Sequence, residues 1–122
     1  MTDDSSALYR RVIDQLVHDT LDGQGQIAAR RIEEGVWNPH APESLADQRA
    51  FSALLSRLSA QDRSVLANWF AQEFVSGVHQ TLVALHEWQI PPFDKAYEGT
   101  PFHDYIGRLD GWNWPDDGRD RS

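Results

Sequence analysis

The sequence predicts an all-α fold: a single compact bundle of four to five helices around a long central helix. Apolar residues recur at i, i+3, i+4 and i+7 in every long segment, which is the spacing of an amphipathic helix. Prolines and paired glycines stand between these segments. The 122 residues suit one domain with one core, and no repeat or charged linker divides them.

The first helix is expected over residues 6–21, because the acidic and hydroxyl side chains of residues 3–6 supply N-caps and negative charge at its start. The opposite, polar half of this helix is expected to face water. Asp14, His18 and Asp22 stand there at metal-ligand spacing, but a solvated face is the interpretation that the apolar stripe favours. The apolar stripe consists of Leu8, Tyr9, Val12, Ile13, Leu16 and Val17.

Two shorter helices are expected next. Glycines stop the first helix, and a second one over residues 26–34 ends at Gly35. In the irregular connection that follows, Trp37 and His40 could line a groove, although an aromatic side chain beside Asn38-Pro39 is more often a packing plug. A third helix is predicted over residues 43–58, with a narrow apolar stripe made of Phe51, Leu54, Leu55 and Leu58.

The longest helix is expected over residues 60–89, with Ser59 as its N-cap and Pro91 and Pro92 at its end. Its apolar residues cover most of the circumference, so we expect it to be central, with neighbours packed on both sides. These residues are Val65, Leu66, Phe70, Phe74, Val75, Val78, Leu82, Val83 and Leu85.

A last helix is predicted over residues 101–110. Thr100 suits the N-cap, Pro101 the first helical position and Gly111 the left-handed residue past the end. The spacing of Asp104 and Arg108 would allow an ion pair along this helix.

The segment after this helix has two interpretations. In a Schellman ending Trp112 folds back on the last turn and Trp114 extends the contact, so that the segment is a lid over the bundle. Alternatively, the aromatic and acidic side chains form a recognition patch, because tryptophan and tyrosine are favoured interface anchors. That patch would consist of His103, Asp104, Tyr105, Trp112 and Trp114. Residues 116–122 are expected to be a flexible polar tail.

Two histidines of the central helix are weak candidates for a metal site. His79 and His86 point the same way, but the helical rise separates them by about 10 Å, which is too far for two ligands of one ion. No HExxH or Glu-x-x-His pair completes such a site, and structural histidines are favoured. No cofactor is expected.

Composition narrows the function classes. The net charge of −8 and the scattered Lys and Arg residues argue against nucleic acid and would attract a basic protein partner. Cysteine is absent, and neither a signal peptide nor a membrane-length apolar run is present, so a cytoplasmic location is expected. No nucleophile elbow or phosphate-binding loop occurs. A DNA mimic is disfavoured because the carboxylates alternate with Arg.

The string AYEGTPFHDYIGRLDGWNWP resembles the carboxy-terminal segment of a family of small bacterial helical proteins of unknown function. The resemblance rests on residues 97–99, then on Pro101, His103, Asp104 and Gly107, and finally on the Gly111-Trp112 and Trp114-Pro115 pairs. It implies a small helical bacterial domain and no mechanism.

We therefore expect a cytoplasmic, non-catalytic protein-interaction module of the immunity or adaptor type, as a monomer or homodimer. The alternative is a metal-binding or enzymatic helical protein that uses His79, His86 and His103. Metal content, and whether those histidines share one cavity, would discriminate between the two.

Overall fold

The computed structural model describes residues 4–36, 38, 42 and 45–115. In these ranges all regular structure is helical and no strand forms, which confirms the predicted all-α class. The helices are α1 (Asp4–Asp22), the 3-10 turn η1 (Gln24–Gln26), α2 (Ile27–Glu34), α3 (Ala46–Arg57), α4 (Ala60–Glu87) and α5 (Pro101–Leu109). The expectations for Trp37, His40 and the tail 116–122 concern positions outside the described residues.

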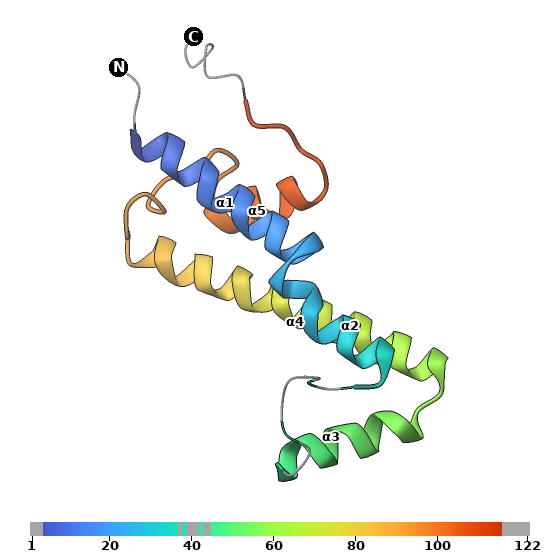
Figure 1. Ribbon diagram of the computed structural model, residues 1–122. Helices are drawn as coiled ribbons and strands as arrows, with labels where there is room; N and C mark the ends of the chain where they lie inside the picture. Colours follow the sequence, from blue (N-terminus) through green and yellow to red (C-terminus); the bar gives the residue numbers. More distant parts are fainter. Residues whose placement is uncertain (1–3, 37, 39–41, 43–44, 116–122) are drawn as a thin grey trace.

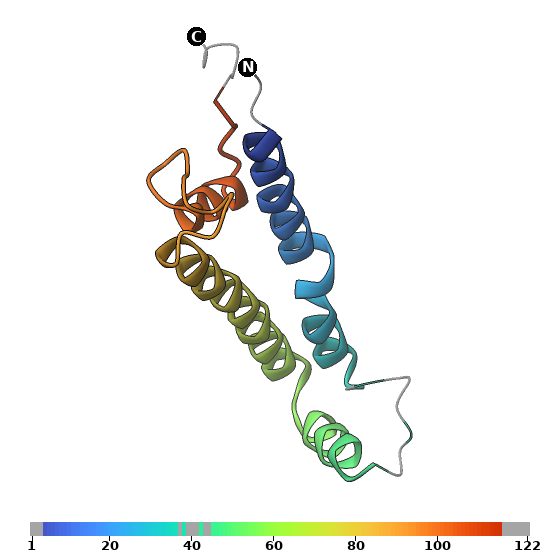
Figure 2. The same ribbon diagram turned by 90° about the vertical axis from the view of Figure 1, so that its left-hand side faces the viewer.

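The helices form two long arms that run side by side. Figure 1 shows α1, η1 and α2 following one another along one arm and α4 returning beside them in the opposite direction. α5 lies at one end of the pair and α3 at the other (Figure 2). The start of α1 and the last described residues share the α5 end, because Arg10 Nη2 donates a hydrogen bond of 3.1 Å to the Pro115 carbonyl.

The core divides into two clusters along α4. The upper cluster, near α5, joins α1, α4 and α5, and the lower cluster joins α2, α3 and the first half of α4. α4 contributes to both clusters, so it is the central helix, as predicted. The buried members are Tyr9, Ile13, Val78, Leu82 and Tyr105 in the upper cluster and Ala29, Ile32, Leu55 and Ala67 in the lower one.

Contrary to expectation, α4 is not covered on all of its apolar sides. Val65 and Trp69 are 65% and 62% exposed, since the other helices pack on the opposite half of the α4 circumference. The α4 end also differs from the prediction. Gln89 adopts a left-handed φ of 54°, and a Schellman pair of hydrogen bonds stops the helix before the two prolines are reached.

Three helix starts differ from the predicted positions. α2 begins one residue later than expected, at Ile27. α1 begins two residues earlier than expected, at Asp4. α3 begins at Ala46 in the described range, and residues 43–44 lie outside it. None of these differences changes which residues form the upper cluster, because the apolar residues of α1 and α4 face the core as the helical spacing predicts.

Candidate functional site

The two ends of α5 are fixed as the sequence predicts. The Thr100 hydroxyl caps the helix by accepting a hydrogen bond of 3.2 Å from the His103 N–H. At the other end the Trp112 N–H donates to the Gly107 carbonyl at 2.9 Å, and the Gly111 N–H donates to the Arg108 carbonyl at 3.1 Å. These two bonds make a complete Schellman motif. Gly111 supplies the required positive φ of 92°. The chain then turns back as a segment that we call the C-terminal strap, residues 110–115.

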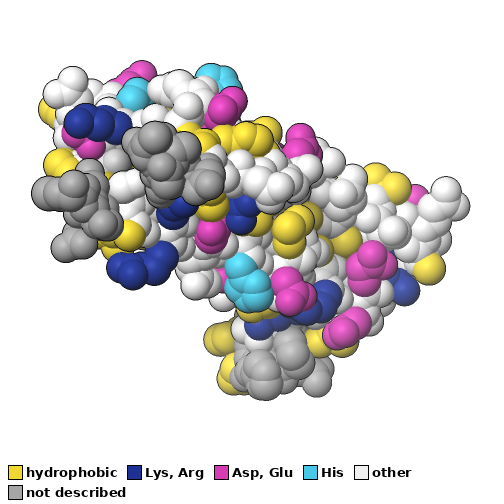
Figure 3. All heavy atoms as spheres, turned by 90° about the horizontal axis from the view of Figure 1, so that it is seen from above, with side chains coloured by type: hydrophobic (Ala, Val, Ile, Leu, Met, Phe, Trp, Pro, Cys, Tyr) yellow, Lys and Arg dark blue, Asp and Glu magenta, His cyan; other side chains and the backbone are white. Residues whose placement is uncertain are grey.

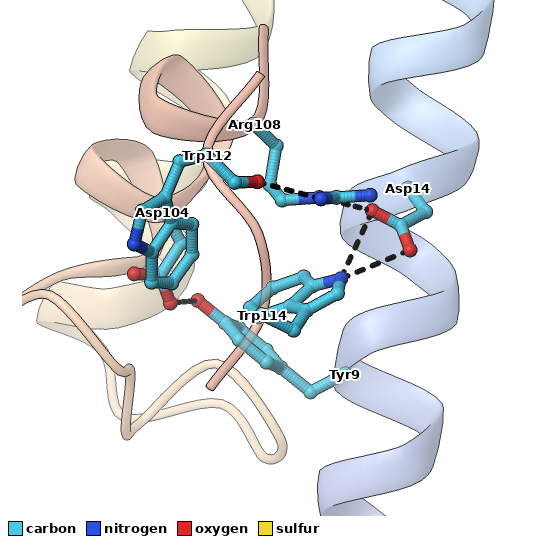
Figure 4. Close-up of polar contacts among 6 residues, drawn as sticks. All are labelled: Tyr9, Asp14, Asp104, Arg108, Trp112 and Trp114. Atoms are coloured by element: carbon cyan, nitrogen blue, oxygen red, sulfur yellow. Dashed lines mark hydrogen bonds and ion pairs between the residues drawn. The ribbon is translucent and has the colours of Figure 1, made fainter. Parts of the chain in front are cut away.

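Trp114 attaches the strap to α1. Its ring centroid lies 6.0 Å from that of Tyr9 and 5.1 Å from that of Tyr97. Its indole N–H donates to both carboxylate oxygens of Asp14, at 3.1 and 3.0 Å (Figure 4). The indole N–H of Trp114 thus has its hydrogen-bond acceptor within the chain. This contact is the kind that the lid interpretation describes.

Asp14 also receives the Arg108 side chain, whose Nε lies 2.8 Å from Oδ1 (Figure 4). The expectation that Asp14 faces water is therefore wrong, and Arg108 pairs with Asp14 and not with Asp104, the pairing that the spacing along the helix would have allowed. The correction has one cause: α5 packs with Asp104 inward, which leaves Arg108 at the α1 interface.

Asp104 is completely buried and joins three segments. Its carboxylate accepts hydrogen bonds from Tyr9 Oη at 2.5 Å, Tyr97 N at 2.9 Å and Glu98 N at 2.8 Å. These donors compensate for the loss of water around the carboxylate. Burial raises the pKa of Tyr9, and the hydrogen bond to Asp104 and its negative charge raise it further, so that Tyr9 stays protonated and keeps donating.

Tyr105, the residue after Asp104, is also completely buried. Its hydroxyl lies 2.6 Å from Thr20 Oγ1, and burial raises its pKa. Asp104 and Tyr105 thus lie in the core, away from the surface. The five residues of the suggested recognition patch therefore do not share one surface. Asp104 and Tyr105 are buried, whereas Trp114 packs against α1 and meets the Trp112 ring edge-on, with centroids 5.3 Å apart.

His103 and Trp112 line a wide hollow beside α5. It has a volume of about 560 Å³ and is lined by Glu98, His103, Ile106, Gly107, Asp110, Gly111 and Trp112; we call it the α5 hollow. Glu98 and Asp110 are exposed, while Ile106 is 38% exposed and adds apolar surface. Sequence reasoning missed both acids, although their positions next to the two caps of α5 were a signal that could have found them.

Two of the three histidines, His79 and His103, share an aromatic neighbour, and His86 has a different one. The Phe102 ring contacts both His79 and His103, with centroids 4.5 and 4.8 Å apart, whereas His86 Nδ1 lies 3.0 Å from the Phe93 carbonyl oxygen. His79 and His86 are half-buried, as predicted for structural histidines. Within the part of the chain that the structure describes, no group of three or more His, Asp or Glu side chains is placed to hold a metal ion.

No described helix combines the length and the hydropathy that crossing a membrane requires. No curated protein and no solved structure is significantly similar to the chain. A family model does match, and it covers residues 2–116, far more than the segment that carries the resemblance. The chain therefore belongs to the family of unknown function DUF6547.

Proposed function

We propose that the protein is a non-catalytic protein-interaction module of the immunity or adaptor type, and that the α5 hollow binds a basic side chain of its partner. The observation that supports this function is the combination, in one open hollow, of two exposed carboxylates with an aromatic ring and aliphatic surface. A Lys or Arg side chain presents the complementary set, a cationic head on an apolar stem.

The charges in the hollow are available to a ligand. Within the described residues, the carboxylates of Glu98 and Asp110 take part in no hydrogen bond or ion pair. Arg108, which follows the hollow residue Gly107, is engaged by Asp14 and by the Trp112 carbonyl at 2.6 Å. A cation 4 Å from one carboxylate gains about 1 kcal/mol in water, and stacking on the Trp112 ring would add about 0.5–1 kcal/mol.

The overall acidity supports the approach of a basic partner without defining a site. On the face drawn in Figure 3, Lys and Arg side chains are interspersed with Asp and Glu. The net charge of −8 therefore acts as a general attraction, and the hollow would supply the specific contact.

The proposal includes a bacterial cytoplasmic setting. The resemblance of residues 96–115 supports the bacterial origin, and the cysteine-free composition supports a reducing compartment. No cofactor and no nucleic acid is part of the proposed function, and the module would act as a monomer or homodimer.

A matched pair of charge variants tests this function. Tagged protein, its Glu98→Gln/Asp110→Asn variant and a Glu33→Gln/Glu34→Gln control would each be used to capture partners from a lysate of the native host, with quantitative mass spectrometry as the readout. Both variants remove two exposed negative charges, but the control pair lies in the last turn of α2, away from the α5 hollow. We expect one stoichiometric partner, retained by the control and reduced at least tenfold by the hollow variant.

Two outcomes contradict the proposal. One is the absence of any stoichiometric partner. The other is an equal loss of the partner with both variants, which would show that net charge, and not the hollow, attracts it.

A further inference from the structure

A second hollow lies between α1 and α4, and its lining is almost purely apolar. We call it the α1–α4 groove. It has a volume of about 470 Å³ and is lined by Val12, Leu16, Phe74, Gly77, Val78, Thr81, Leu82, Leu85 and Phe93. Thr81 carries the one polar side chain in this lining, and its hydroxyl already donates to the Gly77 carbonyl at 2.8 Å. A polar metabolite would find no hydrogen-bonding side chain there, so the groove suits apolar groups.

The groove lies on the face of the α1 and α4 pair opposite α5. His79 contacts Phe102 of α5, whereas Gly77 and Thr81 line the groove. Each stands two residues from His79, which is about 200° around a helix of 3.6 residues per turn. α1 and α4 thus pack against α5 on one face, and on the opposite face they form the apolar α1–α4 groove.

The shape of the groove fits another helix. Its α4 wall runs from Phe74 to Leu85, about 16 Å or three turns at the helical rise. A Cβ placed on Gly77 would meet nothing within 4 Å, so this wall allows a close approach. Two helical walls offer the ridges and grooves into which a third helix packs, with anchors at i, i+3 or i+4, and i+7.

One end of the groove has acidic residues beside it. A Cβ on Gly25 would come within 2.7 Å of the Phe74 ring and 2.9 Å of the Asp19 carbonyl oxygen, so η1 packs closely against α1 and α4 at this end. Asp19 lies there on α1, and Glu73, which is exposed, precedes Phe74 on α4. A basic residue of an occupant would be favoured beside this pair.

We propose that the α1–α4 groove binds one amphipathic helix, about three turns long, from a partner protein. Aliphatic side chains of that helix fill the groove, and a Lys or Arg lies beside Asp19 and Glu73. The site is separate from the α5 hollow and stands whether or not that hollow binds a partner.

The test uses model peptides as probes. A fluorescein-labelled 14-residue peptide of Leu and Lys, with Leu in a single helical stripe, is compared with a peptide of the same composition whose stripe is scrambled. A third peptide keeps the stripe but has Glu in place of Lys. Fluorescence anisotropy with the full chain is expected to show the striped Leu–Lys peptide binding at least tenfold more tightly than either of the others.

Two substitutions at one position locate the binding. Gly77→Leu adds a side chain that fills the groove, whereas Gly77→Ala adds only a methyl group in open space. Both replace a helical glycine, so both are expected to melt at or above the parent temperature. We expect Gly77→Leu to weaken the striped peptide at least tenfold, and Gly77→Ala to change its affinity less than threefold.

Several results would overturn the proposal. Equal binding of the scrambled peptide would indicate charge attraction alone, and an unchanged affinity in the Gly77→Leu variant would place the peptide elsewhere. A dimer in light scattering that dissociates only in Gly77→Leu would assign the groove to a second copy of the chain. Preferential binding of uncharged lipid vesicles over the peptide would assign it to acyl chains.

Discussion

At the scale of single residues, a buried carboxylate carries much of the tertiary organisation. Asp104 binds α1 through Tyr9 and the preceding loop through two backbone N–H groups. A fully buried charge is costly unless hydrogen bonds surround it, and removing one donor leaves that cost partly uncompensated. Local pattern predicted the position of Asp104 on its helix but not its partners, which lie up to 95 residues away in the sequence.

The raised pKa of Tyr9 predicts a loss of stability at alkaline pH. Above the ordinary tyrosine pKa of about 10, the unfolded chain releases the Tyr9 proton while the folded chain retains it, so unfolding becomes more favourable as pH rises. The stabilisation that the Tyr9 proton provides is fully present below pH 10. Tyr9→Phe lacks it and is expected to cost about 1–3 kcal/mol at pH 7, since Asp104 loses a donor.

Urea unfolding of both proteins between pH 8 and 11 measures this difference. The stability gap between the parent and Tyr9→Phe should narrow above pH 10. Tyr105 titrates in both proteins and cancels from the comparison. A constant gap across the range would show that Tyr9 has an ordinary pKa in the folded state.

At the scale of elements, the residues at the two ends of α5 position the α5 hollow and the strap more than the residues inside the helix do. The left-handed Gly111 turns the chain into the C-terminal strap, and Thr100 orients the first turn of α5. Cap residues are visible in a sequence, which is why the boundaries of α5 and its Schellman ending were predictable. The α4 ending was not, because Gln89 takes the left-handed position where a glycine is the usual signal.

The same substitution at two glycines should have opposite effects. Gly111→Ala places a Cβ in a left-handed conformation and is expected to destabilise the fold by about 1–2 kcal/mol. Gly77→Ala lies in a helix with open space around the new atom and is expected to stabilise it by up to about 1 kcal/mol. Chemical denaturation gives both values. A destabilised Gly77→Ala variant would contradict the open surroundings of that residue.

At the scale of the whole molecule, the helix pattern was predictable and the pairing of faces was not. Apolar spacing and helix-ending residues identified the α-helices, yet the apolar pattern placed Val65 and Phe70 on faces of α4 that were expected to be covered, although both are exposed. Hydrophobicity along one helix does not reveal which of its faces the other helices cover. For the same reason the α5 hollow and the α1–α4 groove were not predicted: each is lined by several segments.

The two core clusters predict uneven local stability. α3 contributes Leu55 and its C-cap residue Leu58 to the lower cluster, but Phe51 and Leu54 of α3 are more than 40% exposed. With little apolar surface buried, its opening costs little free energy. Hydrogen exchange should therefore be fastest in α3 and slowest in α1 and in the second half of α4. Uniform protection across all helices would show that the two clusters unfold as one unit.

The contacts of α1 with α5 and with the strap also bear on protein synthesis. Asp14 is synthesised 94 residues before Arg108 and 100 residues before Trp114, the two residues that bind its carboxylate. At about 5–20 residues per second a ribosome needs on the order of 5–20 s to supply them. Until then the upper cluster lacks the Tyr105, Leu109 and Trp114 side chains that complete it beside α1, so chaperones that bind exposed apolar stripes have time to engage the first helix.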